Sequence, residues 1–308
     1  MKKILLVITS FVIAGVMYAQ VQKADSAWKI NGDVNLMFSQ TSFSNWASGG
    51  ENSLTVNGFF NFYAGYTKGK SKWENILNLA YGQTKTGEQD YRKNEDKIDF
   101  LSTYGLKASE KWYYSANLSF KSQFAEGFDY HDDVDSIGPE KISNFMAPGY
   151  LSAGIGMEYR PYDYMSFYIS PITARWIFVT DQDLADAGAF GVEPAVYDAN
   201  GIKTQDGETI RQEFGAYFRF IFAKEIVKNV SFNTKLELFS DYLDNPQNVD
   251  VNWDNMLDLK VNSFLSAKVG LQLVYDDNTN ITDKDGNVGP RTQMKQLLAV
   301  GITYKFNN

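Results

Sequence analysis

The stretch that decides the fold is Met294-Lys-Gln-Leu-Leu-Ala-Val-Gly-Ile-Thr-Tyr-Lys-Phe306. Every second residue in it is apolar or aromatic, with Gln296 the single interruption; these are Met294, Leu298, Val300, Ile302, Tyr304 and Phe306. The residues between them are mixed, with lysines, small residues and one leucine. A period of two predicts a β-strand with one apolar face and one mixed face.

The same alternation recurs along the chain, and it predicts eleven further strands. Their apolar faces span 28–38, 54–64, 73–81, 98–106, 112–124, 151–159, 164–179, 210–222, 230–238, 253–261 and 265–275. In the seventh, the parity slips near Pro171, where we expect a bulge or kink because proline cannot donate to the ladder. About twelve antiparallel strands follow, an even number, as in single-chain outer-membrane barrels.

The connections between these strands alternate in length. Short connections are expected at 68–71, 109–111, 161–163, 223–229 and 262–264, and long ones at 42–51, 84–96, 126–148, 180–207, 243–251 and 276–291. Aromatic residues fall at both ends of the strands: Trp28, Trp73, Trp112, Tyr159, Phe222 and Tyr304 near short turns, Phe38, Tyr81, Phe124, Tyr242, Trp253 and Tyr275 near long loops. Short periplasmic turns, long extracellular loops and two aromatic belts are typical of a transmembrane barrel.

The first residues and the composition agree with export to the cell envelope. Lys2 and Lys3, the apolar segment 4–17 and Ala19 predict a signal peptide over residues 1–19, followed by a barrel over 20–308. The chain has no Cys, which excludes a lipoprotein anchor, and the expected segment 20–308 holds no apolar run long enough for a transmembrane helix. The formal charge is −8, and 27 − 37 = −10 without the two lysines, which argues against nucleic acid. A soluble β-sandwich is the rival fold, since its strands alternate too.

The mixed faces carry charges of both signs, which belong in a lumen because they would be costly against lipid. The candidate lumen residues are Lys121, Arg211, Glu213, Arg219, Lys235, Glu237, Asp258 and Lys260. Charged rings of this kind can select solutes in a pore. The alternative is a barrel filled by paired charges, and the close spacing of Arg211 with Glu213, Lys235 with Glu237 and Asp258 with Lys260 favours a narrow or occluded lumen.

We expect no catalytic, cofactor or metal residue. The single histidine, His131, lies in an expected outer loop with no His-x-Ser segment, which argues against an outer-membrane hydrolase. The loops at 126–148 and 180–207 are rich in carboxylates that could hold Ca²⁺, but the composition favours solvated acidic loops over a calcium site. The Asp283-Lys-Asp-Gly-Asn287 segment lacks the closing Glu of a calcium loop and predicts a turn.

The segment after the first strand holds the loop-binding candidates Asn45, Trp46, Gly49 and Gly50. Trp46 could act as an anchor or stacking platform, and the Gly pair permits a left-handed turn. The alternative is a loop folded over the barrel mouth.

A family resemblance rests on several short segments. They are Asn45-Trp-Ala-Ser-Gly-Gly-Glu-Asn52, Trp73-Glu-Asn75 followed by Tyr81-Gly82, Asp96-Lys-Ile98, Lys121-Ser-Gln-Phe124 leading to Gly127-Phe-Asp-Tyr130, and the Gln296 to Phe306 ending. Together they resemble a Bacteroidota family of outer-membrane proteins of unknown function (DUF3078-like). The aromatic-ended last strand also resembles the closing strand of bacterial outer-membrane barrels, where it is the signal read by the insertion machinery; Tyr304 and Phe306 would be that signal here.

The sequence therefore predicts an outer-membrane β-barrel of the Gram-negative envelope, not an enzyme. Its function is expected to be a narrow pore or transporter for small polar solutes, with a non-conducting scaffold or partner-binding barrel as the alternative. Expected partners are outer-membrane lipid and lipopolysaccharide, the barrel-assembly machinery during insertion, and an envelope protein not identified by the sequence.

Overall fold

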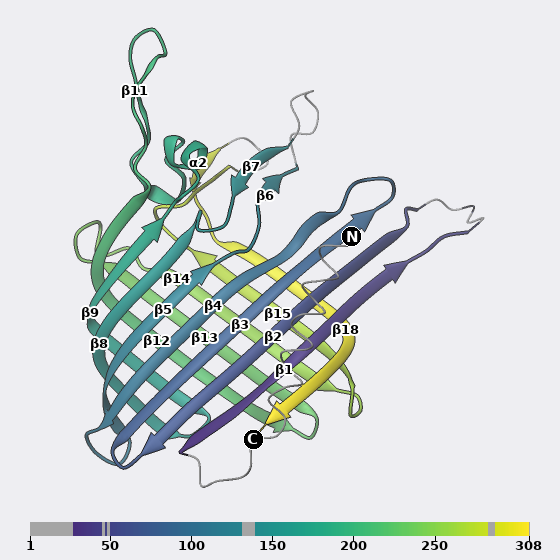
Figure 1. The fold of residues 1–308 in the computed structure, drawn as a ribbon, viewed down its shortest axis with the longest axis vertical. Coiled ribbons are helices and arrows are strands. Elements are labelled where there is room, and N and C mark those ends of the chain that lie inside the picture. Colours follow the sequence, from purple (N-terminus) through teal and green to yellow (C-terminus); the bar gives the residue numbers. More distant parts are fainter. Residues whose placement is uncertain (1–26, 45–46, 48–49, 131–138, 283–286, 308) are drawn as a thin grey trace.

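The structure is a computed structural model that describes residues 27–44, 47, 50–130, 139–282 and 287–307. The expected signal peptide lies outside these residues. Twelve antiparallel strands close into a barrel in the order β1-β18-β15-β14-β13-β12-β9-β8-β5-β4-β3-β2 (Figure 1). The barrel strands are β1 (Trp28–Thr41), β2 (Ser53–Lys68), β3 (Ser71–Thr86), β4 (Arg92–Lys107), β5 (Trp112–Ser122), β8 (Gly149–Tyr162), β9 (Met165–Phe178), β12 (Ile210–Val227), β13 (Val230–Asp241), β14 (Asp250–Lys260), β15 (Leu265–Tyr275) and β18 (Gln293–Asn307).

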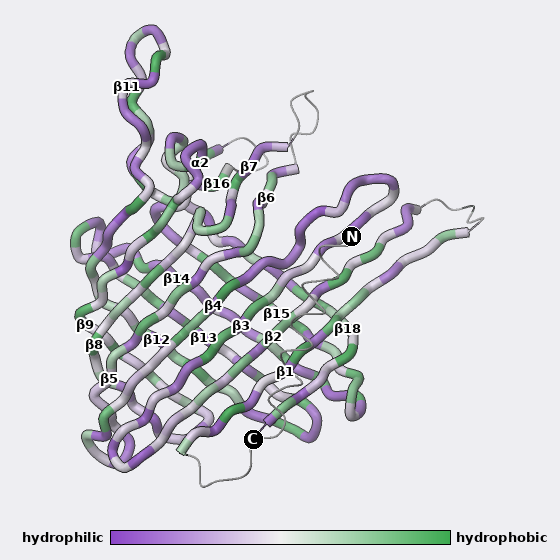
Figure 2. Tube along the Cα trace, viewed as in Figure 1, coloured by the Kyte–Doolittle hydropathy of each residue, from purple (hydrophilic) through white to green (hydrophobic). Residues whose placement is uncertain are grey.

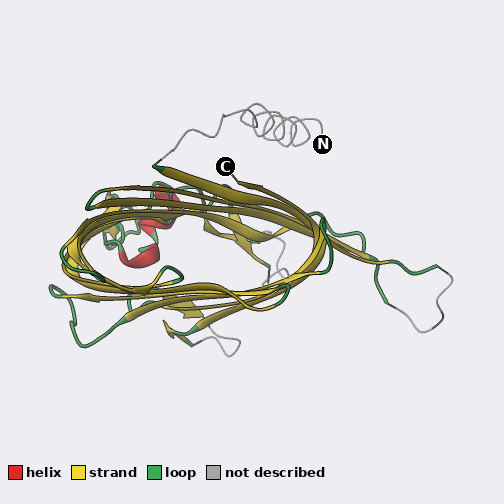
Figure 3. Ribbon diagram, turned by 90° about the horizontal axis from the view of Figure 1, so that it is seen from below, coloured by secondary structure: helices red, strands yellow, loops and turns green. Residues whose placement is uncertain are grey.

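All twelve expected strands are present, and the sheet pairs each with its neighbours along the chain before β18 closes on β1. The rival sandwich is wrong, since a sandwich leaves two separate sheets. Two expected connections were too long. The 84–96 loop shrinks to 87–91, because β3 continues to Thr86 and β4 begins at Arg92, and the 223–229 turn shrinks to Lys228 and Asn229. Viewed from below in Figure 3, the barrel has a flattened, oval cross-section.

The expected irregularity at Pro171 is confirmed as a bulge. On one side the register jumps between Ile155 and Met157 of β8, and on the other between Gly215 and Tyr217 of β12. Ser170 fills the bulge by donating its hydroxyl to the carbonyls of Ile155 and Ile172, at 2.8 and 2.9 Å. The bulge shifts the alternation of β9 by one residue. Even-numbered residues face the lumen before the bulge, and odd-numbered residues face it in the outer part of the strand.

The last strand closes the barrel through a ring packed on a glycine. Phe306 lies directly opposite Gly32 of β1, and a Cβ built on Gly32 would come within 2.5 Å of the Phe306 ring. The same ring stacks on Phe60 of the next strand, with centroids 6.4 Å apart. An aromatic side chain laid over a cross-strand glycine covers backbone that would otherwise face lipid. The expected pairing of the terminal strand with the first strand is thereby confirmed.

The outer surface carries the apolar band that a membrane-spanning barrel needs. Most outward residues of the strands are apolar, and the hydropathy of the trace alternates along the strands in Figure 2. At the short-turn end the aromatic rings touch one another, as in Trp28 with Trp73 at 5.7 Å and Trp112 with Tyr159 at 4.8 Å. At the loop end Tyr81 meets Phe124 edge to face at 6.5 Å. Among the described residues, no helix is long and apolar enough to span a membrane.

An ordered cap lies at the long-loop end. It consists of β6 (Gly127–Asp129), β7 (Glu140–Ser143), α2 (Gln182–Asp186), η1 (Ala189–Gly191), β16 (Asn280–Thr282) and β17 (Val288–Pro290). β10 (Val196–Tyr197) and β11 (Lys203–Gln205) form a hairpin that projects beyond it (Figure 1). A small apolar core of its own joins the cap to β9; its buried members are Ala147, Ile177, Val179, Leu184, Ala185 and Val192. In Figure 3, α2 lies within the outline of the barrel, so the cap covers part of the mouth.

Candidate functional site

The candidate site is the lumen of the barrel. Successive residues of each strand face the lipid and the lumen in turn, and the charged residues lie at the positions that face the lumen. Asp99, Glu158 and Arg219 are among the most deeply buried side chains of the described protein, and Arg219 is only 1% exposed. Charged residues are rarely buried so fully unless they are paired. The lumen is therefore organised by ion pairs at several heights.

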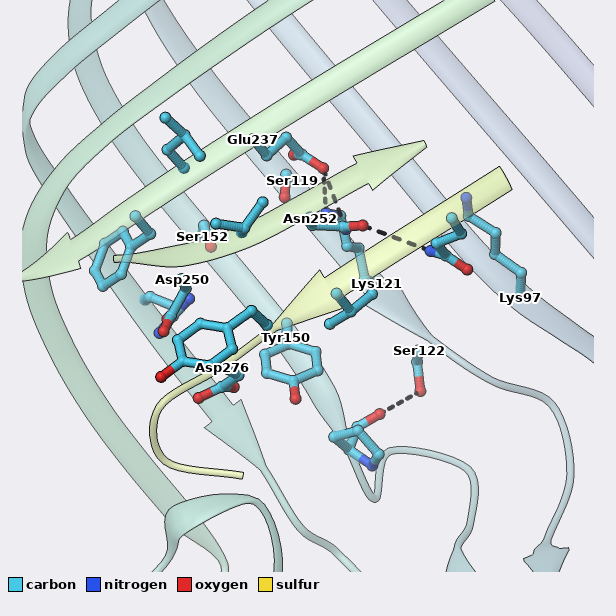
Figure 4. A pocket seen from close by; sticks show the side chains of 18 of the residues that line it. Lys97, Ser119, Lys121, Ser122, Tyr150, Ser152, Glu237, Asp250, Asn252 and Asp276 are labelled. Atoms are coloured by element: carbon cyan, nitrogen blue, oxygen red, sulfur yellow. Dashed lines mark hydrogen bonds and ion pairs between the residues drawn. The ribbon is translucent and has the colours of Figure 1, made fainter. Parts of the chain in front are cut away.

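An outer cavity of about 290 Å³ leads into the lumen from the loop side; we call it the vestibule. Its lining combines tyrosines with charges of both signs, and includes Lys97, Lys121, Tyr150, Arg175, Tyr217, Glu237, Asp250, Tyr275, Asp276 and Lys295. Figure 4 shows Tyr150 beside Asp250 and Asp276 at one end, and Lys121 beside Glu237 at the other. A cavity of this size, lined by both charged and aromatic side chains, can hold a small molecule.

Six linked lumen residues form what we call the gate. Lys97, Lys121 and Glu237 also line the vestibule, and Asp99, Lys235 and Asp254 pair with them or with one another. The Lys97 ammonium lies 3.2 Å from Asp254 and 3.7 Å from Asp99. The Lys235 ammonium lies 2.6 Å from Asp99 and 3.5 Å from Glu237. Lys121 pairs with Glu237, which also accepts the Tyr217 hydroxyl at 2.8 Å. Three ammonium groups thus meet three carboxylates, and the gate has no net charge.

The gate crosses the barrel from wall to wall. Lys97 is on β4 and its partner Asp254 is on β14. The strands β13, β12, β9, β8 and β5 separate these two on one side, and β15, β18, β1, β2 and β3 on the other. β4 and β14 therefore stand opposite each other, and the flattening of the barrel brings their side chains within salt-bridge distance. These paired side chains therefore cross the lumen at this height.

A second crossing lies on the periplasmic side of the gate and is built around Arg219. Its guanidinium donates to Asn117 at 2.5 Å and to Thr103 at 3.1 Å, and lies 3.7 Å from Glu158. Glu158 is also held by Arg160, at 2.8 Å. Arg219 is on β12, whereas Thr103 and Asn117 are on β4 and β5, so these bonds again span the lumen.

Arg160 extends this crossing toward the short turns. Besides Glu158 it pairs with Glu74 of β3, and Glu74 also accepts the Tyr63 hydroxyl at 2.7 Å. Nearer the mouth, Arg175 pairs with both Glu213 and Asp250 and lies 4.0 Å from the centre of the Phe239 ring. Salt bridges thus brace the lumen at the mouth, at the gate and below it.

The eight lumen candidates all lie on inward faces, and five of them join the salt bridges just described: Lys121, Glu213, Arg219, Lys235 and Glu237. The expected neighbour pairs Arg211–Glu213 and Lys235–Glu237 form, at 3.3 and 3.5 Å. The pairing of Asp258 with Lys260 is wrong. Asp258 instead pairs with Lys268 of the adjacent strand, and Lys260 is exposed at the end of β14. A cross-strand cation reaches Asp258 more directly than the neighbour two residues along the same strand.

The candidates in the outer loops are only partly described. Asn45, Trp46 and Gly49 lie outside the described residues, as do His131 and the segment 283–286. Gly50 has a φ of 128°, which side chains rarely allow, and a Cβ there would come within 2.7 Å of the Phe43 ring, so the backbone at this position requires glycine. Among the described residues, no cluster of three carboxylate, histidine or cysteine side chains could hold a metal ion.

Several lumen residues did not stand out from the sequence. Arg175 follows the Pro171 bulge, which reverses the face it occupies, and Glu95 lay in a segment expected to be a loop. Asp254 was missed as well, although Glu74, which the alternation places inward, marks a short repeat that could have found it: Trp73-Glu74-Asn75 and Trp253-Asp254-Asn255. In each copy the acid points inward to a lumen cation, while the outward Trp and Asn share a cross-strand hydroxyl.

The shared hydroxyl is Ser102 in the first copy and Thr234 in the second. The Trp73 indole donates to Ser102 at 2.8 Å, and Ser102 donates to Asn75 at 2.8 Å. In the second copy, the Trp253 indole donates to the Thr234 hydroxyl at 2.9 Å, and this hydroxyl donates to Asn255 at 2.9 Å. The repeat thus satisfies polar groups on the lipid-facing side while it delivers a carboxylate to the lumen.

Outside the membrane, one carboxylate fixes the projecting hairpin to the cap. Asp186 of α2 accepts from the Lys203 ammonium at 2.6 Å, from the Gly207 backbone at 2.8 Å and from Gln182 at 2.7 Å. The bond from Lys203, followed by that from the Gly207 backbone, lowers the pKa of Asp186 to about 2. The hairpin base is therefore tied to α2 by a carboxylate that stays ionised over the ordinary pH range.

The comparison with protein families agrees with the resemblance found in the sequence. Residues 38–128 match the family described as "Protein of unknown function (DUF3078)". This match runs from the outer end of β1 to β6 and includes Lys97, Asp99 and Lys121 of the gate. No curated protein matched the sequence.

Similar solved structures are outer-membrane barrels. An outer membrane channel from Pseudomonas putida F1 has 10% identity and a TM-score of 0.38, covering 93% of this chain and 100% of that one. The NanC porin has 8% identity and a TM-score of 0.35, covering 90% and 100%. The translocator domain of the autotransporter NalP from Neisseria meningitidis has 8% identity and a TM-score of 0.32, covering 92% and 90%. At such low identities the function must be argued from the site itself.

Proposed function

We propose that this outer-membrane barrel is a narrow channel for small polar solutes, and that the gate holds it closed in the structure described here. The observation that carries the proposal is the vestibule, a lumen cavity lined by charged and aromatic side chains that include Lys97, Lys121 and Glu237 of the gate. Each gate ammonium has carboxylate partners, so rearranging a few side chains would widen the lumen without moving the strands. Charged rings at a constriction select permeating ions and solutes.

The balance of charge in the gate provides a direct test. In the double variant Asp99→Asn/Glu237→Gln, three ammonium groups face only the Asp254 carboxylate, so the gate changes from neutral to a net charge of 3 − 1 = +2. Repulsion between the lysines should loosen the crossing, and the excess of positive charge should favour anions. In planar bilayers we expect rare, small openings for the wild type and frequent, anion-selective openings for the double variant.

The matched control is Asp198→Asn, which removes one carboxylate from the projecting hairpin, outside the barrel. It should conduct as the wild type does. Heat-modified mobility on gels would verify that each variant is a folded barrel. If folded wild type and folded double variant both fail to produce single-channel steps or solute leakage from vesicles, the channel proposal is overturned.

The bracing of the lumen at three heights favours a second candidate, a non-conducting barrel that serves as a scaffold or binds a partner in the envelope. For this function the salt bridges would act only as internal supports. Crosslinking in intact membranes should then recover one stable envelope partner in defined stoichiometry. Recovery of bulk neighbours alone, together with conduction by the double variant, would decide against the scaffold.

A further inference from the structure

The seam between the first and last strands is paired over only part of its length. β1 pairs with β2 as far as Thr41 opposite Ser53, and β18 pairs with β15 as far as Gln293 opposite Val274. The register between β1 and β18, however, ends at Phe38 opposite Val300. Among the described residues, the β1-facing edge of 293–299 therefore has no strand beside it. Figure 1 shows β1 and β2 leaning away from β18 toward the loop end.

Below this split the seam is tight. A Cβ on Gly301 would come within 2.1 Å of the Leu36 carbonyl oxygen and 2.6 Å of the Met37 Cα, so β18 and β1 approach each other closely there. Further down, Phe306 covers Gly32. The strands approach closely at both glycines, and they part immediately above the Phe38–Val300 pair. The split is therefore a local feature with a defined lower end.

The split lies within the apolar band of the barrel. Met294 pairs with Leu273 and Leu298 pairs with Val269, and all four side chains point outward. Met294 is 64% exposed and Leu298 is 76% exposed, the latter the most exposed large apolar residue of the described protein. Unpaired strand edges are not stable against hydrocarbon unless something covers them or they line a polar cavity.

On the lumen side, the split opens next to the vestibule. Two residues beside the split line the vestibule: Lys295 of β18 and Val274 of the adjacent strand β15. Lys295 pairs with Glu95 at 2.8 Å. Beside it lies an apolar patch, since a Cβ on Gly270 would be 3.3 Å from the Leu297 Cβ and 3.2 Å from the Met256 methyl. A polar cavity, an apolar patch and the lipid-facing surface thus meet at one gap.

We propose that this split is a lateral portal between the vestibule and the outer leaflet, and that its occupant is the acyl chain of a membrane lipid. The acyl chain would lie against the exposed Met294 and Leu298 and the inner Leu297. The polar end of the lipid and the water of the vestibule would meet the unpaired backbone groups of 293–299. The surrounding bilayer supplies such an occupant to any gap in its hydrocarbon zone, whereas a partner strand would find only Ser39–Thr41 on the β1 side to pair with. The portal goes beyond the proposed channel function and does not require that the lumen conduct.

Paired cysteines test whether the seam is split, because the chain has no native cysteine. Continuing the register would place Ser39 opposite Ala299, whereas Leu36 and Ile302 are observed partners. A disulfide needs Cα atoms within about 7 Å. In the folded barrel, Leu36→Cys/Ile302→Cys should therefore oxidise readily, and Ser39→Cys/Ala299→Cys should do so at least an order of magnitude more slowly. Equal rates in lipid vesicles would show that the seam is closed and would overturn the portal.

Spin labels test what occupies the gap. A label on Leu297→Cys lies on the lumen face beside the split, and a label on Ser152→Cys lies on the lumen face of β8, which is paired on both sides. In vesicles of phosphatidylethanolamine and phosphatidylglycerol, collisions with oxygen report hydrocarbon and collisions with a water-soluble nickel chelate report water. We expect high oxygen accessibility at Leu297→Cys and nickel accessibility at Ser152→Cys. Nickel-only accessibility at both sites, or shielding of Leu297→Cys from both reagents by a bound protein, would each refute a lipid occupant.

Discussion

Arg219 offers the sharpest test of the braced lumen, because it is the most deeply buried cation of the described protein. Arg219→Met keeps an unbranched stem but removes the guanidinium, with its bonds to Thr103 and Asn117 and its contact with Glu158. Breaking a buried charged interaction costs about 3–5 kcal/mol. Glu158 keeps Arg160 at 2.8 Å, and the Arg219 Nε has no acceptor among the described residues, so we expect the lower end, about 3 kcal/mol.

The free energy of unfolding can be measured by urea titration of the barrel in lipid vesicles, followed by tryptophan fluorescence and gel mobility. Lys260→Met is the matched control, since Lys260 also points inward but is exposed at the strand end. It should change stability by less than about 0.5 kcal/mol. Adding Glu158→Gln to Arg219→Met should recover part of the lost stability. In the single variant the buried Glu158 carboxylate has lost one of its two cationic partners, and the second substitution removes that charge. If Arg219→Met is as stable as the control, the crossing does not brace the barrel.

Three further predictions follow from other parts of the molecule. Phe306→Ala uncovers Gly32 and should lower the amount of barrel inserted in the outer membrane more than any loop substitution; normal levels would refute the role of this ring in closure and insertion. Asp186→Asn should free Lys203 and make the hairpin more sensitive to protease. Because the folded-state pKa of Asp186 is lowered to about 2, the wild-type hairpin should keep its protection down through pH 4 and lose it only as the pH falls toward 2; loss near pH 5 would contradict the assignment. Thr234→Val removes a hydroxyl that serves two partners and should cost about 1–3 kcal/mol in the urea titration, with Thr234→Ser near wild type.

The strands could be predicted because each has one face against lipid and one against the lumen, which imposes a period of two. The bulge at Pro171 was also predictable, since a proline inside a strand cannot donate to the ladder. The loop at 84–96 was misjudged because 92–96 is densely charged. In the barrel those charges lie within the strand, where Lys93 pairs with Asp96 and Glu95 reaches Lys295.

The partners of the lumen charges could not be predicted in the same way. Neighbours such as Arg211 and Glu213 are close on any strand, because residues two apart share a face. The pairing of Lys97 with Asp254 depends on which strands stand opposite each other and on how far the barrel is flattened. Neither quantity is encoded in the alternation of a single strand, so the identity of the gate emerged only from the closed structure.

The separation along the chain of the residues in the gate has a consequence for biogenesis. Lys121 and Glu237 are 116 residues apart, Asp99 and Lys235 are 136 apart, and Lys97 and Asp254 are 157 apart. A barrel assembled only as far as β5 would hold Lys97, Asp99 and Lys121. It would lack their partners Asp254, Lys235 and Glu237, which the later strands β13 and β14 supply. The final hairpins would therefore do more than complete the sheet. They would neutralise the gate. An incompletely assembled chain carries an unbalanced charge there, whereas the gate of the finished barrel has no net charge. Full assembly would therefore be favoured as a single cooperative event.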